Sequence, residues 1–151
     1  MKLESSETKR LGFAMNLEAQ WIVGFVDGKG SFHISVERCE DLSIGYIVLP
    51  KFIVVQYRRD AQVLYAFKAY FKCGVVRDIC GNEVEYCVGK LSHLTETIVP
   101  FFGRHLLKTK KRVEFQNFCK VLFKMQRKEH LTLQGIEEIR KLKGKIDLLA
   151  N

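Results

Sequence analysis

A glycine-rich turn that carries charges of both signs follows an apolar stretch near the N-terminus. Residues 21–26 are apolar apart from Gly24, and the turn after them holds Asp27, Gly28 and Lys29. Gly24 and Gly28 are one helical turn apart. Because glycine inside a helix costs about 1 kcal/mol relative to alanine, this pair needs a physical reason. Their spacing removes Cβ atoms from one helix face and lets another backbone approach closely. The alternative is a buried helix that ends in an ordinary glycine cap, but the charges at the exit favour a functional site.

The nine residues 22–30 resemble the LAGLIDADG motif of homing endonucleases. Six of them are residues that this family commonly uses at these positions, namely Gly24, Phe25, Val26, Asp27, Gly28 and Gly30. The resemblance implies metal-dependent cleavage of DNA phosphodiester bonds at a long pseudo-palindromic intron-homing site. It also implies that Mg²⁺, or another divalent cation, is bound by the acid that follows Gly28 and by the backbone carbonyl of Gly28.

In this chain the position of the metal-binding acid is occupied by Lys29. An ammonium group has three donors and no lone pair, so it cannot bind a cation and would repel it. We therefore expect Mg²⁺ binding to be impaired and the chain to bind DNA without cutting it. If two copies of the chain meet at a two-fold axis, their two Lys29 side chains can instead neutralise the scissile phosphates.

The resemblance assigns two further catalytic positions and a mode of assembly. Gln56 falls on the polar residue with which the family positions water, and Lys108 falls on its basic residue near the cleavage site. The chain contains one copy of the motif, and single-motif members of the family act as homodimers that recognise two-fold DNA sites. The resemblance therefore implies a homodimer interface on the motif helix, formed by Trp21, Gly24, Phe25 and Gly28.

Positive charge is concentrated in one part of the chain. The whole sequence of 151 residues has a formal net charge of +8. Residues 104–128 alone contain nine Lys and Arg and a single acid, Glu114. Such a local excess favours a surface that binds a polyanion, because neutralising phosphates releases counterions. A solvated basic helix face is the alternative.

The remaining composition predicts an intracellular protein, and the resemblance implies that it acts at DNA in an organelle or in the cytoplasm. No apolar run approaches the roughly 18 residues of a membrane span, and the N-terminus lacks the apolar segment of a signal peptide. The five cysteines are odd in number and contain no C-x-x-C, which indicates reduced thiols. A zinc enzyme is not indicated, because the four histidines are scattered along the sequence, at His33, His93, His105 and His130. We expect neither a membrane nor a small-molecule partner.

Hydrophobic periodicity places these residues on alternating helices and hairpins. We expect a helix from about residue 17 with Asn16 as its cap, strands at 31–38 and 46–54, a helix between Asp60 and Gly74, strands at 75–79 and 84–88, a helix capped by Ser92 and interrupted by Pro100 and Gly103, and helices at 109–125 and 132–145. This order predicts an α+β fold. The resemblance implies an αββαββα core whose four-stranded antiparallel sheet forms a DNA-binding saddle, followed by extra C-terminal helices. We expect a flexible tail at 1–15 and a single LAGLIDADG endonuclease domain at 16–151.

Alternation along the expected strands assigns a set of side chains to the sheet face that helices do not cover. These residues are Ser31, His33, Ser35, Glu37, Lys51, Arg77 and Glu85. Their mixed polarity suits base edges, whereas a purely basic face suits only phosphates. Phosphate contacts are expected from Arg58, Arg59, Lys110, Lys111 and Arg112. Ile53 shares the open face with Ile47 and Leu49, so either these residues meet thymine methyl groups or the strand register slips at Pro50.

Two other functions fit the same scaffold. Some members of the resembled family are RNA-binding splicing cofactors that assist intron folding and do not need the catalytic acids. A non-enzymatic transcription regulator is the third possibility. Comparing affinity for duplex DNA and for a structured intron RNA at matched salt separates the DNA-binding function from the splicing cofactor.

Overall fold

The computed structural model describes residues 15–150, so the tail predicted at 1–15 lies outside the described residues except for Met15. The elements follow in this order: α2 (Ala19–Lys29), β1 (Gly30–Arg38), β2 (Tyr46–Tyr57), η1 (Arg58–Asp60), α3 (Ala61–Phe71), β3 (Val75–Asp78), β4 (Glu83–Val88), α4 (Leu91–His93), η2 (Leu94–Ile98), α5 (Val99–Arg104), α6 (Lys111–Gln126), η3 (Glu129–Leu131) and α7 (Leu133–Ala150). This succession confirms the predicted α+β fold, with helices α6 and α7 as the C-terminal additions.

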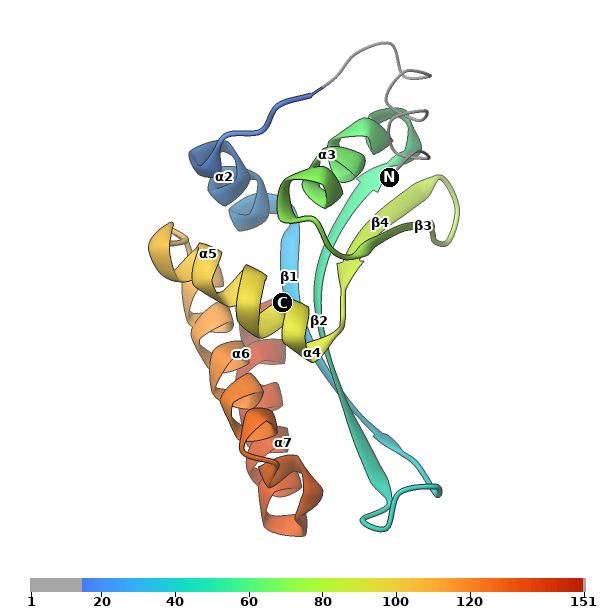
Figure 1. The fold of residues 1–151 in the computed structure, drawn as a ribbon, viewed down its shortest axis with the longest axis vertical. Coiled ribbons are helices and arrows are strands. Elements are labelled where there is room, and N and C mark those ends of the chain that lie inside the picture. The colour runs from blue at the N-terminus through green and yellow to red at the C-terminus, as the bar shows by residue number, and fades with distance from the viewer. Residues whose placement is uncertain (1–14, 151) are drawn as a thin grey trace.

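The four strands form one antiparallel sheet in the order β1-β2-β4-β3. Each hairpin is local, and the pairing of β2 with β4 joins the two. Strand β4 reaches β2 only from Phe52 to Tyr57, so the far half of the β1–β2 hairpin projects beyond the rest of the sheet (Figure 1). Pro50 pairs with Ile34 of β1 and has no partner strand on its other side. Pro50, which has no N–H to donate to a ladder, therefore lies where β2 is an edge strand.

The register of β2 continues without a slip through Pro50. Val48, Pro50, Phe52 and Val54 are all buried, and the residues between them are half-buried on the opposite face. A one-residue slip would exchange these two sets. The alternation predicted for this strand is thus confirmed, and Ile53 lies on the open face.

The covered face of the sheet is built around phenylalanine rings. Phe32 of β1 is 1% exposed. Its ring centroid lies 5.1 to 5.7 Å from those of Phe52, Phe102, Phe115 and Phe118, which come from β2, α5 and α6. Offset and tilted pairs at this spacing pack well and add to the area that each ring buries. Helices therefore cover one face and leave the other face of the curved sheet bare (Figure 1).

Helix starts differ from the predictions at two places. The motif helix begins at Ala19 with Glu18 in the cap position, and no side chain caps it. Asn16 lies too far before the first turn to bond its free N–H groups, so the predicted cap is wrong. Lys90, and not Ser92, occupies the cap position of α4, so that prediction is also wrong.

The interruption predicted at Pro100 and Gly103 is wrong as well. Helical structure runs on from Leu91 to Arg104, with a π-helical turn at Leu94–Ile98. Pro100 is the second residue of α5 and directly follows the π-helical turn, and the helix continues past it. Helix α7 also continues to Ala150, beyond the predicted end near residue 145. Within residues 15–150, no helix combines the length and the apolarity that a membrane span requires.

Candidate nucleic-acid interface

The motif helix passes directly into the first strand at Gly30. A Cβ at this position would lie 2.7 Å from Cγ1 and 3.1 Å from the carbonyl oxygen of Val26, so the sharp transition leaves room only for glycine. Lys29 is the last residue of α2 and is exposed immediately before the sheet begins. The side chain at position 29 is therefore displayed at the corner where helix and sheet meet.

Asp27 attaches the segment before α6 to the end of the motif helix. Its Oδ2 accepts the backbone N–H of Lys108 at 2.9 Å. Its Oδ1 accepts both the hydroxyl of Thr109 at 2.8 Å and the backbone N–H of Thr109 at 3.2 Å. Partial burial favours a higher pKa for Asp27, but the hydrogen bonds from Lys108 and Thr109 outweigh it and hold the pKa below its ordinary value. Asp27 is thus an ionised clamp that the sequence did not reveal, because its partners lie 81 and 82 residues away.

Two of the three predicted catalytic positions, Lys29 and Lys108, lie at this corner, and the third lies on the neighbouring strand β2. Gly30 of β1 pairs with Val54 of β2, so Gln56 lies two residues further along β2, beside the end of α2. Asp27 brings Lys108 to the same end. Gln56 is half-buried, and its Oε1 accepts the N–H of Tyr57 at 3.1 Å.

The side chains at this corner do not fit a divalent cation. Lys29 offers no lone pair, and both oxygens of Asp27 already accept hydrogen bonds. The carbonyl of Gly28 alone does not make a site, since Mg²⁺ takes an octahedron of oxygen ligands. Across residues 15–150, no group of three or more His, Cys, Asp or Glu side chains is arranged to hold a metal ion.

The pairing of the strands brings the predicted base-contact residues onto one face. Ser31 pairs with Ile53, His33 with Lys51, Ser35 with Leu49, Glu37 with Ile47, and Arg77 with Glu85. Ser35 donates a hydrogen bond from its hydroxyl to Glu37 at 2.9 Å, and Nη2 of Arg77 lies 3.2 Å from Oε2 of Glu85. The open face therefore carries donors, acceptors and apolar groups side by side.

The residues predicted to contact phosphates lie at two places. Arg58, on η1, is paired with Asp78 of β3 at 2.8 Å, and the neighbouring Arg59 extends over the ring of Tyr57 with a side chain 78% exposed. Lys108, Lys110 and Arg112 are exposed around the start of α6.

Lys111 differs from its basic neighbours because it turns inward to Glu114. Its Nζ lies 3.3 Å from Oε2 of Glu114, which is 1% exposed. The other oxygen of Glu114 accepts the backbone N–H of Phe32 at 3.1 Å. A buried carboxylate needs such partners, and here they fasten α6 to β1. The single acid of the basic segment is therefore an internal tie, which its sequence context did not indicate.

The outer stripe of α2 consists of Trp21, Gly24, Phe25 and Gly28. Trp21 is 45% exposed and stacks on Phe25 with ring centroids 4.9 Å apart. A Cβ at Gly24 or Gly28 would meet no atom within 4 Å among the described residues. Packing within the described chain therefore does not explain why glycine occupies these two exposed positions.

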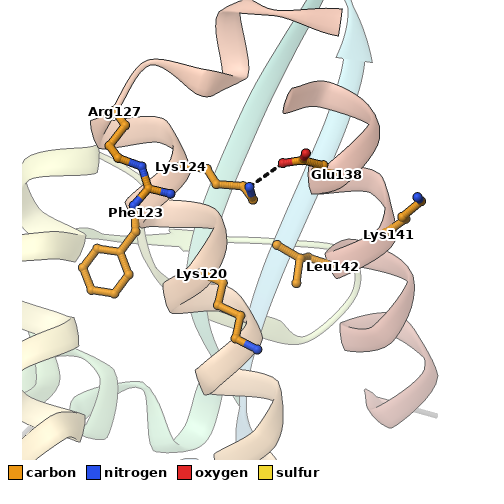
Figure 2. Close-up of a pocket in the computed structure, with 7 residues that line it drawn as sticks. All are labelled: Lys120, Phe123, Lys124, Arg127, Glu138, Lys141 and Leu142. Carbon is orange, nitrogen blue, oxygen red and sulfur yellow. Dashed lines mark hydrogen bonds and ion pairs between the residues drawn. The ribbon is translucent and has the colours of Figure 1, made fainter. Parts of the chain in front are cut away.

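A separate groove of about 420 Å³ lies between α6 and α7 (Figure 2). Lys124 bridges the two helices through Glu138 at 2.5 Å and also contacts Glu129 at 3.2 Å. Lys120 and Lys141 are exposed on the two sides of this pair. The groove contains none of the residues predicted to contact DNA, so it is distinct from the open face of the sheet.

Comparisons of the sequence and of the structure with known proteins point to the same family. The family model described as LAGLIDADG endonuclease matches residues 22–122. The chain is 28% identical over 127 residues to "Probable intron-encoded endonuclease 2" of Neurospora crassa, a match that covers 83% of this chain and 26% of that protein. The chain thus spans about a quarter of the length of this curated relative.

Solved structures match both the fold and the sequence. The crystal structure of the homing endonuclease I-TnaI superposes with a TM-score of 0.84 at 42% identity, covering 90% of this chain and 95% of that one. I-SmaMI, solved bound to an uncleaved DNA target in the presence of calcium ions, superposes with a TM-score of 0.84 at 31% identity. That match covers 86% of this chain and 45% of I-SmaMI.

Proposed function

The chain belongs to the LAGLIDADG endonuclease family, and on that premise we propose that it binds a specific double-stranded DNA site without cutting it. The bare face of the sheet supports the binding, because it combines donors, acceptors and apolar groups. Such a surface suits the major groove, where each base pair presents its own pattern. Exposed cations such as Arg59, Lys108 and Arg112 supply the phosphate contacts. An intracellular location at DNA belongs to the same proposal.

We infer the absence of cleavage from Lys29, which stands at the position of the metal-binding acid. Phosphodiester hydrolysis in this family is expected to use a divalent cation at the end of the motif helix, and an ammonium group at this position repels such a cation. Asp27 does not replace the missing acid, because Lys108 and Thr109 occupy both of its oxygens. The positive charge of Lys29 instead attracts the phosphates that a metal would contact, so binding is retained.

We also propose that two copies assemble through the outer stripe of α2. The exposed glycines support this arrangement, since they leave space that no other described part of the chain uses. The match to 45% of I-SmaMI agrees with it, because two copies would supply what one longer chain contains. In sedimentation, Gly24→Leu should give monomers, whereas Gly144→Leu, at an exposed helical glycine of α7, should leave the dimer intact. Equal effects of the two substitutions would contradict the proposed interface.

Cleavage assays on a selected site test the central proposal. The full chain is used to select bound duplexes from a random DNA library, and the selected duplex is then incubated with Mg²⁺. We expect binding without cleavage by the chain itself and cleavage of both strands by Lys29→Glu, which restores a carboxylate. Lys29→Gln is the matched control, since it removes the charge without supplying a ligand. Rapid cutting by the unsubstituted chain would overturn the proposal, and an inactive Lys29→Glu would assign the defect to another residue.

The same selection separates DNA binding from the RNA alternative. Affinity for the selected duplex and for a structured intron RNA is measured at matched salt, because both depend on phosphate neutralisation. We expect tighter binding to the duplex. Tighter binding to the RNA would favour a splicing cofactor, and a short operator-like site together with an uncleaving Lys29→Glu would favour a transcription regulator.

A further inference from the structure

One row of the open face differs from its neighbours by being apolar. Strand pairing places Ser31 of β1 opposite Ile53 of β2, Ile53 opposite Cys87 of β4, and Cys87 opposite Val75 of β3. Three of the four residues in this row carry no charge and no oxygen or nitrogen in the side chain. The next row on one side contains the Arg77–Glu85 ion pair.

We call these three apolar side chains the Ile53–Cys87–Val75 notch, because the two outer residues are more exposed than Cys87 between them. Val75 is 51% exposed and Ile53 is half-buried, whereas the shorter Cys87 between them is only 6% exposed. Neighbouring strands lie about 4.8 Å apart, so the two taller side chains stand on either side of a recessed sulfur. The floor of the notch is thus a small apolar group with apolar walls.

The thiol at the floor stays neutral at physiological pH. Burial raises the pKa of Cys87, and the carboxylate of Glu85 raises it further, while Arg77 and Lys51 act in the opposite direction. A neutral buried thiol behaves as a small hydrophobe. The notch therefore disfavours polar base edges and can accept a methyl group.

We propose that the Ile53–Cys87–Val75 notch receives the 5-methyl group of a thymine in the major groove and so fixes one base of each half-site. This inference rests on the proposed DNA binding. Among the four bases only thymine presents a methyl group in the major groove. The polar row that contains Arg77 and Glu85 confines the apolar contact to one position. A pair of symmetric half-sites would then contain one such thymine each.

A uracil scan of the selected duplex tests this inference. Each thymine is replaced in turn by uracil, which keeps every hydrogen-bonding group and lacks only the methyl. We expect about fourfold weaker binding at one position in each half-site, the effect of one methyl-sized apolar contact. Cytosine at that position should bind more tightly when replaced by 5-methylcytosine.

Two substitutions connect this effect to the notch. Cys87→Leu should fill the notch and abolish the preference for thymine over uracil, and Ile53→Ala should weaken it by removing one wall. Cys80→Leu, at an exposed cysteine of the β3–β4 turn, is the matched control and should leave the preference unchanged. Thermal melting verifies that each variant is folded.

The possible outcomes separate the inference from the function on which it rests. Failure of the library to yield any enriched duplex would overturn the proposed DNA binding and the notch together. An enriched duplex that tolerates uracil at every position would overturn the notch alone. A uracil effect that persists in both Cys87→Leu and Ile53→Ala would also overturn it.

Discussion

The two faces of the sheet are built from alternate residues of the same strands and have opposite properties. On β1, Phe32 and Ile34 are fully buried against helices, while Ser31 and His33, which alternate with them, face outward. The covered face stabilises the fold through close packing, which tolerates little change in volume. The open face contributes little to packing and is available for recognition. Neighbouring residues can therefore govern stability and binding separately.

Phe32→Ala should break the covered face and produce the largest effect. Removing a ring that packs against four other phenylalanines leaves a cavity and should lower the free energy of unfolding by about 3–5 kcal/mol. Chemical denaturation monitored by circular dichroism measures this change. Phe32→Leu is the control and should cost less, because more of the volume is retained. A loss below about 1 kcal/mol for the alanine variant would contradict the central place of this ring.

Arg77→Ala should act mainly on the open face and leave the chain folded. We expect about tenfold weaker binding to the selected duplex, since a well-placed arginine contact to a base contributes about 1–3 kcal/mol of discrimination. The free energy of unfolding should fall by about 1–3 kcal/mol, because the side chain of Glu85 is only 11% exposed and loses its cation. Lys120→Ala, in the α6–α7 groove, should leave duplex binding nearly unchanged. Equal losses in the two variants would show that binding depends on overall charge and not on the open face.

Acidification should have the smallest effect, and it acts at the corner where α2 and the sheet meet. The folded pKa of Asp27 lies below its ordinary value of 3.8, so the ionised clamp stabilises the fold above pH 3.8 and loses this contribution as the pH falls through the lower folded pKa. The difference in unfolding free energy between the native chain and Asp27→Asn should be constant from neutral pH down to about pH 5 and shrink below pH 3.8. Denaturation at a series of pH values measures it. A difference that grows on acidification would contradict the clamp.

Local patterns were enough to predict the strands and their faces. Alternation has a period of two in any strand, so the open positions of β1 and β2 could be assigned without knowing their partners. The pairing of Ser31 with Ile53 then agreed with that assignment. Helix starts could not be predicted in the same way. Asn16 and Ser92 are good capping residues, but tertiary packing decides at which residue each helix begins.

Contacts between distant segments could not be predicted. Asp27 was recognised only as part of a motif, and Glu114 only as an isolated acid among basic residues. Their roles depend on backbone N–H groups of Lys108, Thr109 and Phe32, and every residue type except proline offers such a group. No property of the local sequence indicates which one will be used.

These long-range bonds also order the assembly of the protein during its synthesis. Asp27 bonds Lys108, 81 residues later, and Phe32 bonds Glu114, 82 residues later. Both hairpins are local and can form as soon as they leave the ribosome, whereas the corner beside Lys29 stays incomplete until α6 has been translated and has docked. A nascent chain that stops before α6 therefore displays a sheet without its finished corner. The surface proposed to bind DNA is therefore completed late in translation, after residue 126 of the 151 has been added.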